Sequence, residues 1–128
     1  MKSIKYHELV SAATGLKMSY DDMIRTGERI VTMERALNTR FGIRRKDDTL
    51  PRRFLKDAIP SGPTKGERFD AHRLRTMVDE YYGRRGWDKK SGLLVKDRLE
   101  ELGLKDVAND LAKRRLLAPA GKKAGKKR

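Results

Sequence analysis

The sequence contains no cysteine among its 128 residues, and this absence removes several classes of function. Without thiolates the chain can form no disulfide, ligate no iron–sulfur cluster through cysteine, build no thiolate zinc site and use no cysteine nucleophile. It also contains no apolar run of membrane-spanning length, and its N-terminus lacks the apolar core of a signal peptide. We therefore expect a cytoplasmic protein.

The sequence also lacks the patterns that mark common catalytic and cofactor sites. It has no phosphate-binding glycine fingerprint, no nucleophile elbow and no zinc-binding helix motif. His7 and His72 are the only histidines, and neither has a second ligand-type residue at metal-binding spacing. Asp47 and Asp48 are adjacent and have basic neighbours, so we interpret them as loop-ordering ion pairs rather than as an acid and base pair. The residues alone thus indicate no catalytic, metal-binding or cofactor-binding position in this chain.

Charge is abundant and unevenly placed. Charged residues make up 39% of the chain and apolar residues 37%, and the formal net charge is +14. Such a composition builds only a modest core, so we predict one domain over residues 1–116. Residues 117–128 are rich in Pro, Gly, Ala and Lys, and we predict that they form a disordered basic tail.

Hydrophobic periodicity predicts one long helix from Ser19 to about Phe41, around which the rest of the chain is organised. Ser19 and Asp22 form a capping signature at its start, and Gly42 follows its end. The apolar side chains gather on one face, which we predict to be buried: Tyr20, Met23, Ile24, Gly27, Ile30, Val31, Leu37 and Phe41. The opposite face, predicted to be exposed, carries Asp21, Asp22, Arg25, Glu28, Arg29, Thr32 and Arg35.

Two polar residues, Glu34 and Asn38, interrupt the centre of the apolar face. One interpretation is that Glu34 pairs with an arginine of this chain, or that the edge of the face meets water. The other is that the helix lies against a second, polar surface supplied by another chain. Gly27 on the same face indicates close backbone approach, because Gly within a helix otherwise costs about 1 kcal/mol relative to Ala.

Further helices are predicted on both sides of this one, which makes the fold class all-α with about five helices. The expected segments are 3–14 ending near Gly15, a single turn after Pro51, 70–82 capped by Asp70 and stopped by Gly83, 95–102, and 105–115 after a break at Gly103. Trp87 is expected to close over the aromatic end of the helix that begins after Asp70. The long Pro- and Gly-rich loop between Gly42 and Phe69 is predicted to be an extended arm on a neighbouring surface.

The basic tail raises an alternative function. The string GKKAGKKR could neutralise several phosphates, and LEELGLKDVANDLAKRRL is similar to a helix-turn-helix. Asp106 and Asp110 on the second helix weaken this interpretation. The alternative is therefore a basic helical module that binds nucleic acid through its C-terminal tail.

Four strings resemble one family in order and spacing, over residues 7–112. They are ELVSAATG (8–15), GERIVTMERALNTRFGIRRKDDTLPRRF (27–54), DEYYGRRGWD (79–88) and LEELGLKDVANDL (99–111). Together they resemble the C-terminal end of the tungsten-containing aldehyde ferredoxin oxidoreductases. Enzymes of that family carry a bis-pterin tungsten (sometimes molybdenum) cofactor and a [4Fe–4S] cluster. They oxidise aldehydes to carboxylic acids and pass electrons to ferredoxin.

The resemblance implies that the chain is the C-terminal helical domain of such an enzyme, as a fragment or a separate chain. The family's cluster cysteines and pterin-binding motifs lie upstream of the point that corresponds to His7 and Glu8, so no ligand is carried over and no activity is expected from the chain alone. Its implied partner is the cofactor-bearing upstream part, with ferredoxin as an indirect partner. The candidate docking or pocket-wall residues are Arg44, Arg45, Lys46, Asp47, Asp48 and Glu34. The alternative is that the string RKDD only stabilises its own turn.

Overall fold

A computed structural model of the chain describes residues 5–119, and in this part every regular element is helical. The elements are α1 (Tyr6–Thr14), α2 (Tyr20–Arg40), the 3-10 turn η1 (Arg45–Asp47), α3 (Arg52–Lys56), α4 (Ala71–Arg85), α5 (Lys96–Glu101) and α6 (Lys105–Lys113). The predicted all-α class is confirmed. None of these helices is both long and apolar enough to cross a membrane.

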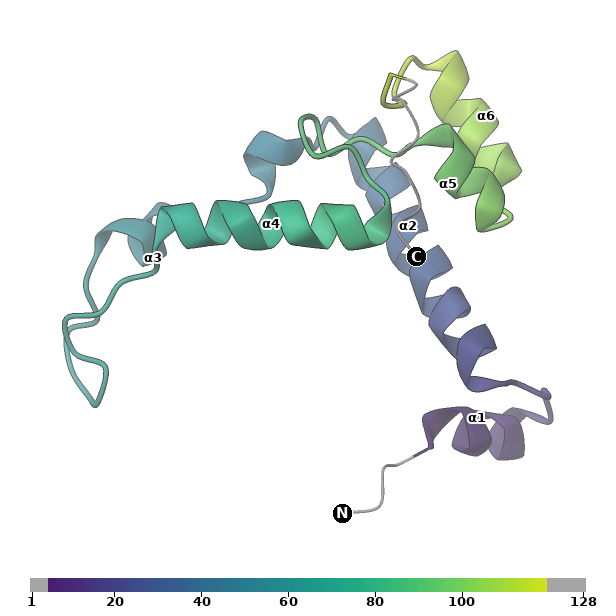
Figure 1. The fold of residues 1–128 in the computed structure, drawn as a ribbon, viewed down its shortest axis with the longest axis horizontal. Coiled ribbons are helices and arrows are strands. Elements are labelled where there is room, and N and C mark those ends of the chain that lie inside the picture. The colour runs from purple at the N-terminus through teal and green to yellow at the C-terminus, as the bar shows by residue number, and fades with distance from the viewer. Residues whose placement is uncertain (1–4, 120–128) are drawn as a thin grey trace, which may run out of the picture.

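The helices form an open arrangement around one end of α2 (Figure 1). α6 lies beside the C-terminal half of α2, whereas α5 contacts the N-terminal half through Arg25 and Glu28. The C-terminal end of α4 meets the C-terminal half of α2. From there α4 extends away toward α3, while α1 contacts α2 near its N-terminal end. The meeting point of α2, α4, α5 and α6 is therefore where a core can form.

Side-chain caps explain where the two longest helices begin. Ser19 Oγ accepts a hydrogen bond of 3.1 Å from the Asp22 N–H, and Asp22 Oδ2 accepts one of 3.0 Å from the Ser19 N–H. This is the capping box that the sequence predicts. Asp70 Oδ1 likewise accepts a 2.7 Å bond from the His72 N–H at the start of α4. Both predicted caps are confirmed.

The predicted end of α4 at Gly83 is wrong, because the helix continues to Arg85. Gly86 ends it instead, with φ +69° in the left-handed region that favours glycine. Trp87 then follows directly and packs against the aromatic end of α4, as expected. Its ring centroid lies 5.6 Å from those of both Tyr81 and Tyr82.

The core is small and lies mainly between α5, α6 and the segment after α4. Its buried apolar side chains are Ala36, Tyr82, Trp87, Leu94, Leu99, Leu102, Leu104, Ala108 and Leu111. Leu99, Leu102, Leu104, Ala108 and Leu111 come from α5, α6 and the turn between them, and Val107 is partly buried against them. Leu94 forms isolated β-bridges with Trp87 and with Leu117, and these bridges close one side of the core.

The prediction for the buried face of α2 is wrong within this chain. The buried residues of the helix are Thr32, Arg35, Ala36 and Thr39, from the polar side. The predicted inward residues Ile24, Ile30, Leu37 and Phe41 are exposed, Phe41 by 78%. Small Thr and Ala side chains allow α6 to come close. Of the predicted inward residues, Val31 is partly buried against the core, while most of the apolar face points away from it.

The loop between α3 and α4 folds back on itself. Ile59 N–H donates to the Glu67 carbonyl at 2.8 Å, Gly66 N–H donates to the Ile59 carbonyl at 2.9 Å, and Phe69 N–H donates to the Phe54 carbonyl at 3.2 Å. The loop lies beyond the N-terminal end of α4, far from the core (Figure 1). Its contact with a neighbouring surface stays a prediction.

The division of the chain at residue 116 also stays a prediction. Leu117 forms a β-bridge with Leu94, and the Ala118 N–H donates to the Leu94 carbonyl at 2.9 Å. Hydrogen bonding to the core therefore continues to Ala118. The remainder of the predicted basic tail, residues 120–128, lies outside the described residues.

Candidate functional site

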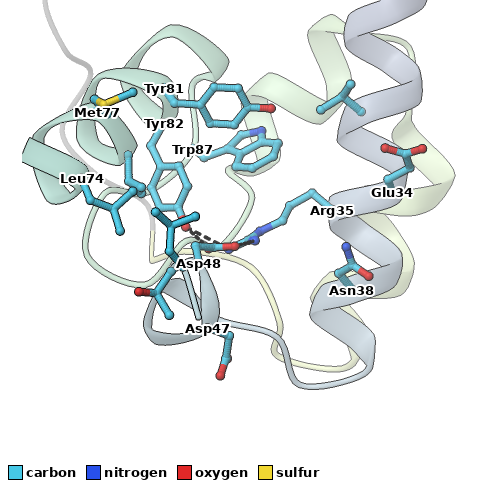
Figure 2. A pocket seen from close by; sticks show the side chains of 14 residues that line it. Glu34, Arg35, Asn38, Asp47, Asp48, Leu74, Met77, Tyr81, Tyr82 and Trp87 are labelled. Atoms are coloured by element: carbon cyan, nitrogen blue, oxygen red, sulfur yellow. Dashed lines mark hydrogen bonds and ion pairs between the residues drawn. The ribbon is translucent and has the colours of Figure 1, made fainter. Parts of the chain in front are cut away.

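A groove of about 540 Å³ lies between α2 and α4, and it contains three of the predicted site residues (Figure 2). One wall comes from α2 and the other from α4, while the loop after η1 closes one side. The lining residues are Val31, Glu34, Arg35, Asn38, Asp47, Asp48, Thr49, Leu50, Leu74, Met77, Val78, Tyr81, Tyr82 and Trp87. The groove is thus mostly apolar, with a few polar groups from α2 and the loop.

Arg35 is the central polar residue of this groove. Its side chain is only 5% exposed, and it forms a two-pronged ion pair with Asp48, with Nη1–Oδ1 at 2.8 Å and Nη2–Oδ2 at 2.7 Å. Arg35 Nε donates to the Gly92 carbonyl at 2.9 Å, and Nη2 lies 3.1 Å from the Tyr82 hydroxyl oxygen. The guanidinium carbon also lies 5.2 Å from the Trp87 ring centroid. One cation therefore joins α2, the loop, α4 and the segment after it.

The Tyr82 hydroxyl completes the network by donating to Asp48 Oδ2. Burial raises the pKa of Tyr82, and this hydrogen bond raises it further, to about 12. The phenol therefore stays protonated at neutral pH and remains a hydrogen-bond donor.

The pKa of the Asp48 carboxyl moves the other way. Burial alone would raise this pKa, but hydrogen bonds from Arg35 and Tyr82 outweigh burial and hold it below its usual range. For Arg35, burial opposes the charged form, but the hydrogen bonds that it donates to Asp48 still raise its pKa. Both carboxylate oxygens of Asp48 already accept hydrogen bonds at neutral pH. This network is therefore suited to fixing geometry and not to proton transfer.

Gly92 is the position where the network needs a glycine. Its φ is +72°, and a Cβ there would lie 2.8 Å from Tyr82 Oη and closer still to Arg35 Nη2. Real Cβ atoms essentially never make contacts this short. A side chain at Gly92 would therefore push Arg35 away from Asp48.

Three further predicted site residues hold the loop that carries Asp48. Asp47 Oδ2 accepts a 2.8 Å bond from the Arg44 N–H, and Arg44 Nη1 donates to the Thr39 carbonyl at 2.8 Å. Arg45 pairs with Asp79 of α4 at 2.8 Å, and its guanidinium carbon lies 5.3 Å from the Tyr82 ring centroid. These contacts order the turn from within, as the alternative interpretation of RKDD expects.

Glu34 and Lys46 behave differently from the other four candidates. Both are exposed, and neither forms an ion pair within residues 5–119. Glu34 lies on the α2 wall of the groove beside Asn38, and no dashed line joins it to the other residues drawn in Figure 2. The predicted partnership of Glu34 with an arginine of this chain is absent from the described part.

Sequence reasoning missed three residues of the network: Arg35, Tyr82 and Gly92. Periodicity predicts Arg35 on the exposed face of α2, whereas it is buried, and no motif marks Tyr82 or Gly92. Asp48 was expected to pair with its basic neighbours, whereas its strongest partner lies 13 residues away. The sequence does place Arg35 before and Asp48 after the C-terminal end of α2. No local sequence pattern, however, specifies that these two residues pair.

The residues of this chain do not fit a metal cofactor or an iron–sulfur cluster. The sequence has no cysteine, and residues 5–119 contain no group of three or more His, Asp or Glu side chains that could hold a metal. Asp48, the most buried carboxylate of the groove, is already occupied by Arg35 and Tyr82. No step of metal or cluster chemistry is therefore derived from this chain.

Comparison with known proteins supplies the context for this site. The family model for domains 2 and 3 of aldehyde ferredoxin oxidoreductase matches residues 1–104. The tungsten-containing aldehyde ferredoxin oxidoreductase of Pyrococcus furiosus is 42% identical over 100 residues, which are 77% of this chain and 16% of the relative. The enzyme of the same name from Pyrococcus horikoshii is 41% identical over 102 residues, 79% of this chain and 16% of the relative.

More distant relatives match a similar share of the chain. The WOR-like subunit of an aliphatic sulfonate oxidoreductase from Pyrococcus furiosus is 31% identical over 113 residues, covering 84% of this chain and 18% of that subunit. Among solved structures, the active-site complex BamBC of benzoyl coenzyme A reductase, in complex with 1,5-dienoyl-CoA, matches with a TM-score of 0.69 and 28% identity. That match covers 90% of this chain and 16% of the other.

The chain thus spans about one sixth of the length of the relatives it matches, and it corresponds to a small part of a larger enzyme. The matches give no support to the nucleic-acid alternative, and Asp110 on α6 is paired with Arg114 at 3.0 Å. The family model covers far more than half of the residues. The chain belongs to the aldehyde ferredoxin oxidoreductase family, in which it corresponds to the helical C-terminal region.

Proposed function

We propose that this chain supplies the C-terminal helical part of a tungsten-dependent enzyme that oxidises aldehydes to carboxylic acids. In that reaction the aldehyde carbon gains an oxygen from water, and the two electrons released pass to ferredoxin. The single observation that carries the proposal is the family match over residues 1–104, together with 42% identity to a tungsten-containing aldehyde ferredoxin oxidoreductase. We assign the redox chemistry to the cofactor-bearing part, because the sequence has no cysteine and residues 5–119 contain no metal-binding group of side chains.

The surface of the chain supports a docking role within such an enzyme. Among residues 5–119, fifteen large hydrophobic side chains are exposed, whereas the buried core contains nine residues. Exposed apolar surface on this scale is typical of a protein that binds another surface. The proposed partner is the cofactor-bearing part of the enzyme.

The six candidate site residues divide into two roles under this proposal. Arg44, Arg45, Asp47 and Asp48 fix the loop and the angle between α2 and α4, so they shape one wall of the groove. Glu34 and Lys46 have exposed charges, and they are the side chains that we expect to reach the partner. Together they would form a pocket wall at the junction with the cofactor-bearing part.

Reconstitution tests the proposed function. The purified chain is mixed with the cofactor-bearing remainder of a family enzyme, such as the Pyrococcus furiosus protein without its matching region, and aldehyde-dependent reduction of ferredoxin is measured. We expect activity from the mixture and from neither part alone. A mixture that forms no complex, or a purified chain that contains stoichiometric tungsten or iron, would contradict the proposal.

A cytoplasmic location forms part of the same proposal. Fractionation of cells that express a tagged chain tests it, with the tag expected in the cytosolic fraction together with the cofactor-bearing partner. Recovery of both proteins in a membrane fraction would contradict it.

A further inference from the structure

The exposed face of α2 follows a regular spacing that continues through the whole helix. Its residues are Tyr20, Met23, Gly27, Ile30, Glu34, Leu37 and Phe41, which are separated by three and four positions in alternation. We call this set the α2 seam. Alternation of three and four is the heptad spacing by which one helix packs lengthwise against other helices. All seam residues except Met23, which is partly buried, are exposed.

No contact or backbone conformation within residues 5–119 requires a glycine at position 27 of the seam. A Cβ at Gly27 would meet nothing within 4 Å, and its φ lies outside the left-handed region. Glycine in the middle of a helix is unfavourable relative to alanine, so a position that could hold a side chain freely calls for an outside cause. Close approach of a partner backbone at Gly27 is such a cause.

Glu34 is the charged position of an otherwise apolar or aromatic seam. Its carboxylate is exposed in this chain and has no cationic partner within residues 5–119. Burial of the seam would remove this carboxylate from water, which is unfavourable unless a cation meets it. A single polar residue on a heptad seam also fixes the register of the packed helices.

The positions beside the seam are mixed: Ile24, Val31 and Met33 are apolar, whereas Thr26, Asn38 and Arg40 are polar. Ile24 and Met33 lie on its two flanks and are exposed. In a two-helix coiled coil these flanking positions are often charged. Over residues 24–33 both flanks carry apolar residues, which fits a helix that lies in a groove and is contacted on both sides along this stretch.

We infer that the α2 seam inserts into an apolar, helix-lined groove of the cofactor-bearing part, with backbone closely approaching Gly27 and a lysine or arginine meeting Glu34. This inference rests on the proposed function and specifies the surface that joins the two parts. We assign the covering surface to the cofactor-bearing part because about five-sixths of each relative's length lies outside the region that matches this chain. A second copy of the chain is disfavoured because each copy carries a net charge of +14.

Binding measurements with matched variants test the seam. The full chain and its variants are titrated into the cofactor-bearing remainder of the Pyrococcus furiosus enzyme, and Kd is measured by biolayer interferometry. Gly27→Leu adds a bulky side chain at the point of closest approach, and Glu34→Lys reverses the charge. Ala112→Leu is the control, because it adds the same side chain as Gly27→Leu at an exposed position of α6 away from the seam.

We expect Kd to rise at least tenfold for Gly27→Leu and Glu34→Lys and to stay unchanged for Ala112→Leu. Far-UV circular dichroism of each free variant shows whether α2 is intact, which we expect because nothing in the chain contacts a Cβ at Gly27. If the wild-type chain binds and both seam variants bind equally well, the seam is overturned and the proposed function survives. If the wild-type chain does not bind, the proposed function fails and the seam fails with it. A wild-type chain that sediments alone as a dimer, while Gly27→Leu is monomeric, would overturn the assigned occupant.

Discussion

The two faces of α2 have opposite surroundings. In the C-terminal half, the buried residues Thr32, Arg35, Ala36 and Thr39 face the loop, α4 and α6. On the other face, Ile24, Ile30, Leu37 and Phe41 are exposed along the length of the helix, which extends from the core toward α1 (Figure 1). One helix thus contributes its polar side to the chain's own core and leaves its apolar side uncovered. The comparison teaches that the stability of this chain and its assembly depend on different faces of one helix.

The largest difference is expected between two leucines, one in the core that the buried face of α2 joins and one on its exposed face. Leu99→Ala removes a side chain that is 0% exposed, so it should lower the free energy of unfolding by about 2–5 kcal/mol. Leu37→Ala removes one that is 52% exposed on the α2 seam, and its effect on the free chain should be below about 1 kcal/mol. Urea unfolding followed by circular dichroism measures both. Equal losses would show that the seam is packed inside the free chain and would break the comparison.

The next effect concerns the ion pair that closes the C-terminal region. Asp48→Ala leaves the Arg35 charge buried without its partner, which should cost about 2–4 kcal/mol of unfolding free energy. Asp47→Ala is the matched control, because Asp47 is exposed and only caps η1. Loss of this cap should cost about 1 kcal/mol. A loss for Asp48→Ala no larger than that of the control would contradict the central place of Arg35.

The pH dependence of the free energy of unfolding tests the same network through Tyr82. The pKa of Tyr82 is about 12 in the folded chain, whereas an unfolded tyrosine has a pKa of about 10. A group whose pKa is raised by folding stabilises the fold fully below its unfolded pKa and loses that effect as pH rises through the folded one. Stability should therefore fall between about pH 10 and pH 12. Denaturant titrations across this range should show the fall in the wild type and a smaller one in Tyr82→Phe.

The smallest predicted change is an increase in the free energy of unfolding, and it concerns a residue on the exposed face of α2. Gly27→Ala should raise the free energy of unfolding of the free chain by up to about 1 kcal/mol, since it replaces glycine in an open helical position. Thermal unfolding of the free chain measures this gain. If Gly27→Ala destabilises the free chain, Gly27 has a role inside the domain and the two faces are not separate in function.

Local signals predicted the helices well, and long-range contacts limited what could be predicted of the site. The Ser19 cap is formed by residues three positions apart, so the sequence specifies it directly. Gly83 and Gly86 are equally plausible helix ends by composition, and only tertiary contacts decide that Gly86 takes the left-handed conformation. The pairing of Arg35 with Asp48 depends on how the chain turns after α2, which no periodicity contains.

The error about the buried face of α2 has a specific physical origin. Apolar periodicity indicates which side of a helix avoids water in its working environment, and it carries no information about which polypeptide covers that side. Nothing within residues 5–119 covers Leu37 or Phe41, so the prediction that they are buried is wrong for this part of the chain. Arg35 could be buried on the other side because Asp48 compensates its charge.

The buried guanidinium of Arg35 also bears on how fast assembly can proceed. It joins α2 to the loop and α4 inside this chain alone, so the angle between the two helices is set before any partner arrives. A surface that is already ordered loses less conformational entropy when it associates. Association is also faster when binding requires no conformational change. The arginine therefore makes the domain a rigid, pre-shaped component for assembly.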